Sequence, residues 1–288
     1  MIGKILLNKY RVTKQIGEGT YSTVYEARHI FKLTKVAVKF DYDEISKRLI
    51  ENEINNYIYL QKNNMSEIAG IKSFGKLEDR NFIIMKKLDT SLDKYYELHY
   101  YNDSIEKMKI SNLKIIGMLI KLIENFHKLN LIHRDIKPEN FMFDSNKSLC
   151  IIDMGMSKQY ESSVKSTTFI GNKLFSSYNT HLSEYIYSPK DDIISIFFMM
   201  FFLISNGDLP WKNICLLNTK FEGAIYYNLK KYTDFKKYYK NIENYILIEP
   251  ILRLYEIVEY NTPTHSFCNY IYLKNTIKQL IDSLIGSI

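Results

Sequence analysis

A short polar stretch near the middle of the chain carries side chains that could do chemistry. Asp135, Lys137 and Asn140 lie within residues 133–140, and a further carboxylate follows at Asp153. The Asp135 carboxylate can orient a hydroxyl and accept its proton, while the Lys137 ammonium can neutralise charge on a phosphoryl group in transit. Asn140 and Asp153 offer oxygen ligands, which Mg²⁺ prefers. These residue types at this spacing predict a phosphoryl-transfer site that uses Mg²⁺.

The segments around this stretch predict rigid support for it. Leu131 and Ile132 precede it and residues 149–152 follow it, and both runs are apolar, as expected for short buried strands. Residues 113–129 carry apolar side chains at helical spacing, so we expect a long helix to lead into the stretch.

Length and composition limit the class of protein. A chain of 288 residues can bury a large core, in one large domain or in two lobes. Its net charge of +7 favours acidic partners in general, whether proteins, nucleic acid or anionic lipid. The sequence has no Arg/Lys block with interleaved aromatic residues and no zinc-type spacing, so we expect no nucleic-acid partner.

Cysteines and apolar runs bear on the compartment. Cys150, Cys215 and Cys268 are odd in number and far apart, which is typical of reduced thiols in a reducing compartment. No basic-then-apolar signal segment opens the chain, so we expect an intracellular protein, cytoplasmic, nuclear or both. Residues 193–204 are almost wholly apolar but too few to cross a bilayer, and they predict a buried helix and no membrane span.

The N-terminal part is expected to be β-rich. Residues 9–28 predict a strand, a turn and a strand, with Gly17 and Gly19 at the turn. Because glycine has no side chain, its backbone amide can approach a phosphate, although an ordinary hairpin turn has the same composition. Residues 35–40 predict the next strand, in which Lys39 becomes functional only where a carboxylate holds it.

The following helix supplies the candidate carboxylates. Residues 45–60 show apolar side chains at helical spacing. Glu51 and Glu53 both lie on this helix. We expect Glu53 to form the ion pair with Lys39, and Glu51 is the alternative.

Four segments together resemble the protein kinase family. They are the glycine loop, the run Val36-Ala37-Val38-Lys39, the stretch that begins His133-Arg134-Asp135, and Asp153-Met154-Gly155. The resemblance implies an α+β, two-lobed fold in which residues 1–288 form a single kinase domain with ATP in its cleft. About residues 1–87 would form a β-rich N-lobe with one main helix, and about residues 88–288 a larger helical C-lobe.

The resemblance also places the hinge between the lobes. Strands are expected at residues 70–75 and 81–85, and the apolar run that ends at Met85 looks like the approach to the hinge. A helix is expected to open near Leu92, and later helices near 242–258 and 270–285 complete the C-lobe.

The resemblance extends to the casein kinase 1 family. Residues 171–182 contain Asn179-Thr180-His181-Leu182, similar to the run that this family carries in place of Ala-Pro-Glu. Residues 188–192 and 209–211 resemble two further segments of that family. This implies a Ser/Thr protein kinase that prefers acidic or already phosphorylated sequence near its target. The sequence gives no reason to expect a stable oligomer, so we expect a monomer. Asp192 would hold the backbone of the catalytic loop.

The family's functional residues are carried over by position. Asp135 and Lys137 would be catalytic, Asn140 and Asp153 would hold Mg²⁺, and Lys39 would reach the ATP phosphates. The other residues implied to bind the nucleotide are Ile16, Gly17, Gly19, Val24, Ala37, Glu53, Met85, Leu88 and Met142.

The sequence departs from the family pattern at four positions. Met154 stands in place of a Phe and is expected to keep its packing role. Ser22 replaces a third loop glycine and should still permit nucleotide binding. Asn172 replaces a Thr that helps to position the catalytic Asp, and Leu174 replaces an anion-binding Arg, for which the adjacent Lys173 is a partial substitute.

Three other functions are compatible with parts of this sequence. A pseudokinase or scaffold would keep the fold and bind nucleotide without efficient transfer. A small-molecule kinase of related fold is disfavoured by residues 171–182, and a basic nucleic-acid binder would show salt-dependent binding to duplex DNA.

Overall fold

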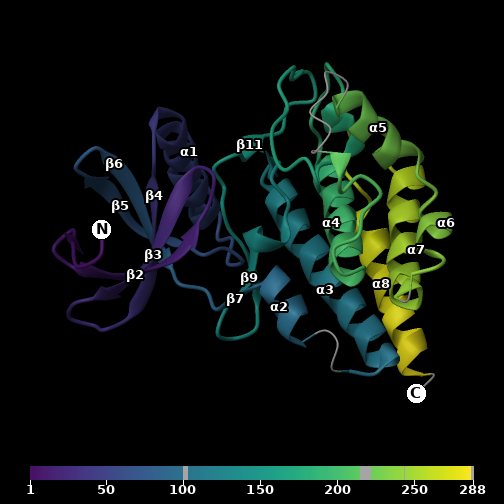
Figure 1. The fold of residues 1–288 in the computed structure, drawn as a ribbon, viewed down its shortest axis with the longest axis horizontal. Helices are drawn as coiled ribbons and strands as arrows, with labels where there is room; N and C mark the ends of the chain where they lie inside the picture. Colours follow the sequence, from purple (N-terminus) through teal and green to yellow (C-terminus); the bar gives the residue numbers. More distant parts are fainter. Residues whose placement is uncertain (100–102, 215–221, 243, 287–288) are drawn as a thin grey trace. The chain divides into compact units, whose positions relative to one another are not determined.

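The computed structural model describes residues 1–99, 103–214, 222–242 and 244–286, so Cys215 lies outside the described residues. The chain forms two compact units, shown with their elements in Figure 1. The first unit comprises Met1–Ser91 and Phe141–Ser157, and the second comprises Leu92–Asn140 and Lys158–Ile288. The segment that carries Asp153 therefore belongs with the N-terminal residues, although it follows the catalytic stretch in the sequence.

The first unit is built on a six-stranded antiparallel sheet in the order β1-β2-β3-β4-β6-β5. Alternate side chains such as Ala27, Val36, Val38 and Phe40 are buried and form its core. The predicted strands are confirmed, and the two-residue β1 was not predicted. Their bounds are β1 Ile5–Leu6, β2 Tyr10–Glu18, β3 Ser22–His29, β4 Lys35–Asp41, β5 Ile71–Leu77 and β6 Arg80–Lys86.

Helix α1 (Glu44–Lys62) packs against β4, β5 and β6 of this sheet. Its first turn is closed by a reciprocal cap, in which Asp43 accepts from the Ser46 N–H and Ser46 accepts from the Asp43 N–H. Ile50, Tyr57 and Leu60 bury its apolar face. The helix predicted at 45–60 is confirmed.

A three-stranded sheet in the order β10-β9-β7 completes the first unit. The Ile151 N–H of β10 donates to the Glu67 carbonyl, which fixes the chain just before Asp153. The strands are β7 Thr90–Ser91, β9 Phe141–Phe143 and β10 Leu149–Ile151, of which only β10 was predicted. β7 and β9 are too short to show a period.

The second unit is mainly helical. Helix α4 (Pro189–Ile204) is almost wholly buried and contacts α3 and α7, and after its charged first turn it is apolar on nearly all sides. Within the described residues, no helix combines the length and apolarity needed to span a membrane. The other long helices are α3 Ile105–Lys128, α7 Tyr245–Asn261 and α8 Tyr270–Ile285.

Shorter elements connect these helices. Sequence periodicity placed the start of α3 at residue 113, but the helix begins at Ile105, after its cap Ser104. The prediction missed this start because residues 105–111 mix apolar with charged side chains and are exposed or half-buried. Helices α5 and α6 were not predicted. The shorter elements are α2 Leu92–His99, β8 Leu131–Ile132, η2 Pro138–Asn140, β11 Lys158–Gln159, η3 Tyr178–His181, α5 Glu222–Tyr232 and α6 Phe235–Tyr239.

Candidate active site

Lys39 in β4 is held by two carboxylates within the first unit. Its Nζ lies 2.7 Å from Glu53 Oε2 and 2.8 Å from Asp153 Oδ1. Glu53, on α1, is 1 % exposed, whereas Glu51 points to solvent. The predicted ion pair with Glu53 is therefore confirmed.

Burial and charge act in opposite directions on this group. Burial disfavours the charged lysine, but the carboxylates of Asp153 and Glu53 outweigh it and raise the pKa of Lys39. Burial raises the pKa of Glu53 to about 7, against the opposing effect of Lys39. We take Lys39 to stay protonated, since two carboxylates lie within hydrogen-bond distance of it.

One face of the large sheet brings together several residues implied to bind the nucleotide. Val24 lies directly opposite Lys39 in the β3–β4 ladder, and Ala37 lies opposite Met85 in the β4–β6 ladder. Because side chains alternate along a strand, Ala37 and Lys39 share a face, and their cross-strand partners share it too. Gly17 pairs with Val24 at the edge of this set.

The glycine loop closes as a tight hairpin. The Gly19 N–H donates to the Ser22 carbonyl at 2.9 Å. Ser22 pairs with Asp41 in the ladder and does not adopt a positive φ, so this position does not require glycine. Ile16 lies at a register shift in β2 and is 39 % exposed.

The two remaining nucleotide-site candidates lie near the end of β6. Leu88 is buried two residues after this strand, and the next N–H, of Asp89, donates to the Phe143 carbonyl of β9. Met142 is half-buried on β9, paired with Ser91 on one side. Every residue proposed from the sequence to bind the nucleotide therefore lies in the first unit.

The turn that begins at Asp153 packs against α1. Asp153 adopts a φ of +61°, and the Met154 side chain is fully buried, so the expected packing role of Met154 is confirmed. A Cβ on Gly155 would lie 3.3 Å from the Leu49 carbonyl oxygen of α1. This close approach explains the glycine.

The catalytic stretch lies in the second unit and centres on Asp135. Lys137 Nζ donates to Asp135 Oδ2 at 2.7 Å, and Asn140 Nδ2 donates to the same oxygen at 3.1 Å and to the Asp135 carbonyl at 2.8 Å. Asp135 is 5 % exposed. The structure thus brings these three predicted residues together. Because Asn140 uses its nitrogen here, its Oδ1 is left as an oxygen ligand suited to Mg²⁺.

A buried carboxylate on α4 supports this loop. Asp192 accepts from the backbone N–H groups of His133 (2.7 Å) and Arg134 (3.0 Å), as predicted, and also from the Tyr187 hydroxyl. His127 Nε2 donates to it at 2.9 Å, a contact that the sequence did not indicate. Burial opposes ionisation of Asp192, yet its hydrogen bonds and the neighbouring histidines lower its pKa.

Residues 171–182 begin against the same loop. Gly171 has a φ of +106°, and a Cβ there would lie 2.2 Å from the Arg134 carbonyl oxygen. Only glycine fits this approach. Asn172 Oδ1 accepts from the Leu174 and Phe175 N–H groups, so its side chain closes the turn that follows.

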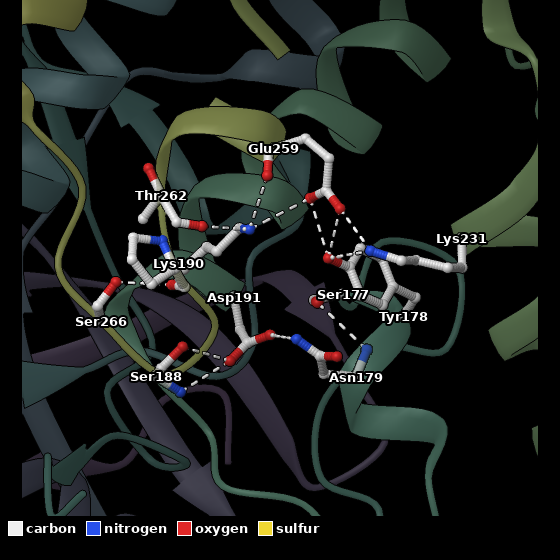
Figure 2. A network of polar contacts seen from close by, with 11 residues as sticks. Ser177, Tyr178, Asn179, Ser188, Lys190, Asp191, Lys231, Glu259, Thr262 and Ser266 are labelled. Atoms are coloured by element: carbon white, nitrogen blue, oxygen red, sulfur yellow. Dashed lines mark hydrogen bonds and ion pairs between the residues drawn. The ribbon is translucent and has the colours of Figure 1, made fainter. Parts of the chain in front are cut away.

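A polar network fixes the second half of this segment (Figure 2). Asn179 Nδ2 donates to Asp191 Oδ1 at 3.3 Å, and the Tyr178 hydroxyl donates to Glu259 Oε1 at 2.7 Å. Lys231 Nζ contacts the same Glu259 oxygen at 2.6 Å. Lys190, buried on α4, lies 3.4 Å from the other Glu259 oxygen and joins α4 to α7.

A buried lysine completes the attachment of the segment. Lys230 Nζ of α5 donates to the Lys173 and Ser176 carbonyls at 2.7 and 2.6 Å, and lies 3.0 Å from His181 Nε2. Burial lowers its pKa well below the usual value. The acceptors around this nitrogen nevertheless favour the ammonium form, which has three donors. Its Nζ also lies 5.2 to 5.7 Å from the ring centres of Tyr226, Trp211 and Phe198.

Comparison with models of protein families matches residues 10–286 to the protein kinase domain. The chain belongs to the protein kinase family. The kinase domain is 24% identical to a probable serine/threonine-protein kinase of Dictyostelium discoideum over 274 residues, which cover 87% of this chain and 54% of that protein. It is 28% identical to casein kinase I homologs 1 and 2 of Saccharomyces cerevisiae over 225 and 228 residues, which cover 73% of this chain and 40% of each homolog. The chain therefore spans about half or less of these relatives.

Proposed function

We propose that this kinase domain transfers the γ-phosphoryl group of ATP to Ser or Thr hydroxyls of proteins. The observation that carries the proposal is the Asp135 cluster, in which one buried carboxylate has an ammonium at 2.7 Å and an amide at 3.1 Å. These groups provide a proton acceptor, a positive charge and a metal-ligand oxygen, the three requirements of the reaction. The names of the relatives, a serine/threonine-protein kinase and casein kinase I homologs, support the acceptor class.

In this mechanism each residue acts mainly by position and charge. Asp135 accepts a hydrogen bond from the substrate hydroxyl and takes its proton, and Lys137 offsets the negative charge of the phosphoryl group. Lys39, fixed by Glu53, binds the α- and β-phosphates. We propose Asp153 and Asn140 as the ligands of Mg²⁺, which neutralises charge on the phosphates when bound.

The substrates we propose are acidic proteins without an obligatory priming phosphate. Leu174 offers no charge, and Lys173 forms an ion pair with Glu222 at 3.0 Å. An anion near Lys173 would therefore have to compete with a carboxylate already in place. The net charge of +7 favours acidic partners in general.

The test is transfer of labelled γ-phosphate from Mg²⁺-ATP to an acidic, Ser/Thr-rich protein. Asp135→Asn keeps the shape of the side chain and removes the proton acceptor, so we expect transfer to fall by about 10²–10⁴-fold, the usual contribution of a general base. Absence of transfer by the wild-type protein with ATP still bound would favour a nucleotide-binding scaffold. Equal transfer by both proteins would contradict the role of Asp135.

A further inference from the structure

Two asparagines on α1 hold the turn that carries Asp153. Asn52 Nδ2 donates to the carbonyls of Gly155 (2.8 Å) and Ser157 (2.9 Å). Asn56 Nδ2 donates to the carbonyls of Met154 (2.9 Å) and Ser157 (3.2 Å). Each amide thus uses both of its N–H donors on backbone oxygens of one turn.

The asparagines share a helix face with Glu53. Residues four apart in a helix lie one above the other, and Glu53 lies beside this pair. One face of α1 therefore has two roles. It presents the Glu53 carboxylate to Lys39, and it holds the turn that presents the Asp153 carboxylate to the same lysine. A Cβ added to Gly155 would lie 3.5 Å from Leu49 Cβ. The turn and the helix are therefore in close contact, with no side chain of residue 155 between them.

The conformation of Asp153 requires such support. Its φ of +61° is left-handed, which costs free energy for a residue other than glycine and persists only where surrounding contacts impose it. The hydrogen bonds from Asn52 and Asn56 supply contacts of this kind, because their acceptors are carbonyls of the residues that follow Asp153.

We propose that Asn52 and Asn56 are positioning residues for the metal ligand Asp153. They fix its carboxylate beside Lys39, so that the turn is held ready for Mg²⁺ without a separate ordering step. The inference rests on the proposed function, since it assigns Asp153 to Mg²⁺. Groups that support a metal ligand typically change metal affinity or activity about 10- to 100-fold when removed.

The test replaces each asparagine with leucine, which has similar size and no donor. Asn55→Leu is the matched control, since Asn55 lies on the same helix and is exposed. We expect Asn52→Leu and Asn56→Leu to raise the Mg²⁺ concentration for half-maximal transfer by about tenfold and to lower kcat, with the KM for a peptide substrate unchanged. Asn52→Gln keeps an amide donor at a half-exposed position, so this variant should retain most of the wild-type Mg²⁺ dependence and kcat.

A second readout does not depend on transfer. The thermal midpoint should still rise on addition of adenosine in every variant, while the further rise with Mg²⁺-ATP should shrink in Asn52→Leu and Asn56→Leu only. Leucine variants that match Asn55→Leu in both readouts would overturn the proposal, and so would variants that no longer fold, because the residues would then be needed for folding alone. If the wild-type protein transfers no phosphate, the proposed function fails, and the Mg²⁺-ATP shift still decides the role of the asparagines.

Discussion

At some positions of this domain the residue type is determined by a nearby backbone atom and not by charge. Gly171 illustrates this, because its position combines a left-handed φ with a backbone oxygen where a Cβ would be. The sequence marked Gly171 only as the start of a family-like segment. Its contact with the Arg134 carbonyl ties that segment to the loop that carries Asp135.

We predict that Gly171→Ala disables the domain. The left-handed conformation alone costs an L-residue about 1–2 kcal/mol. The clash at 2.2 Å must in addition displace the Arg134 backbone, next to Asp135. Since a displacement of about 1 Å can cost about 10²-fold in rate, we expect at least that loss of transfer. Urea unfolding and a phosphate-transfer assay measure the two effects.

Gly207→Ala is the control for this prediction. Gly207 also has a positive φ, +85°, but a Cβ there would only touch the Phe202 ring at 3.5 Å. The Gly207→Ala variant should lose only the roughly 1–2 kcal/mol that a left-handed conformation costs an L-residue, and it should keep its transfer activity. If Gly171→Ala behaves like Gly207→Ala, the contact with Arg134 does not position the catalytic loop.

At the scale of elements, the sequence predicted those with a clear period. Helix α1 buries one face, and β5 alternates half-buried with exposed residues. Strands β4 and β6 are buried on both faces over most of their length, and their runs 36–38 and 82–85 are continuously apolar. Helix α5 has no such pattern, because its buried positions include Lys230, a residue that normally marks a surface. A charged side chain enclosed by carbonyls and rings cannot be recognised before the fold is known. Asn52 and Asn56 were not predicted either, although the sequence places these two amides four residues apart on either side of Glu53.

The packing of α5 against residues 171–182 leads to a pH prediction. Burial, Lys230 and Lys173 lower the pKa of His181 to about 2. Below about pH 6.5 the unfolded chain therefore binds a proton at His181 that the folded protein does not bind, so stability falls as the pH is lowered. Between pH 7 and pH 5 this amounts to about 2 kcal/mol.

His181→Gln tests this assignment. Glutamine does not titrate and can still accept from Lys230, so the variant should lose about 2 kcal/mol less than the wild type between pH 7 and pH 5. The measurement is the free energy of unfolding from urea titrations at both pH values. Parallel losses in the two proteins would show that His181 titrates normally.

At the scale of the whole molecule, the candidate residues divide between the two units. The residues proposed to bind nucleotide, together with Asp153, lie in the first unit, and Asp135, Lys137 and Asn140 lie in the second. Motif spacing identified both groups, because each motif is short and local in sequence. It could not identify His127, Lys190 or Lys230, whose partners lie far away in the chain.

The charge of the whole chain gives a prediction about substrates. With 39 basic and 32 acidic residues, the domain should attract an acidic peptide over distances at which no specific contact forms. Salt shortens that range, from about 10 Å at 0.1 M to about 3 Å at 1 M. With Mg²⁺-ATP saturating, the KM for an acidic Ser-containing peptide should rise by about 3- to 10-fold between 0.05 and 0.5 M NaCl, at nearly constant kcat.

A peptide in which Gln and Asn replace Glu and Asp is the control for this effect. It keeps the acceptor serine and the length of the acidic peptide but has no charge to screen, so its KM should change little. If the KM of both peptides rises equally, salt acts on the enzyme and the general positive charge does not select substrates. If the neutral peptide is the better substrate at low salt, the general positive charge does not select acidic substrates, an outcome that fits a Lys173 already held in an ion pair by Glu222.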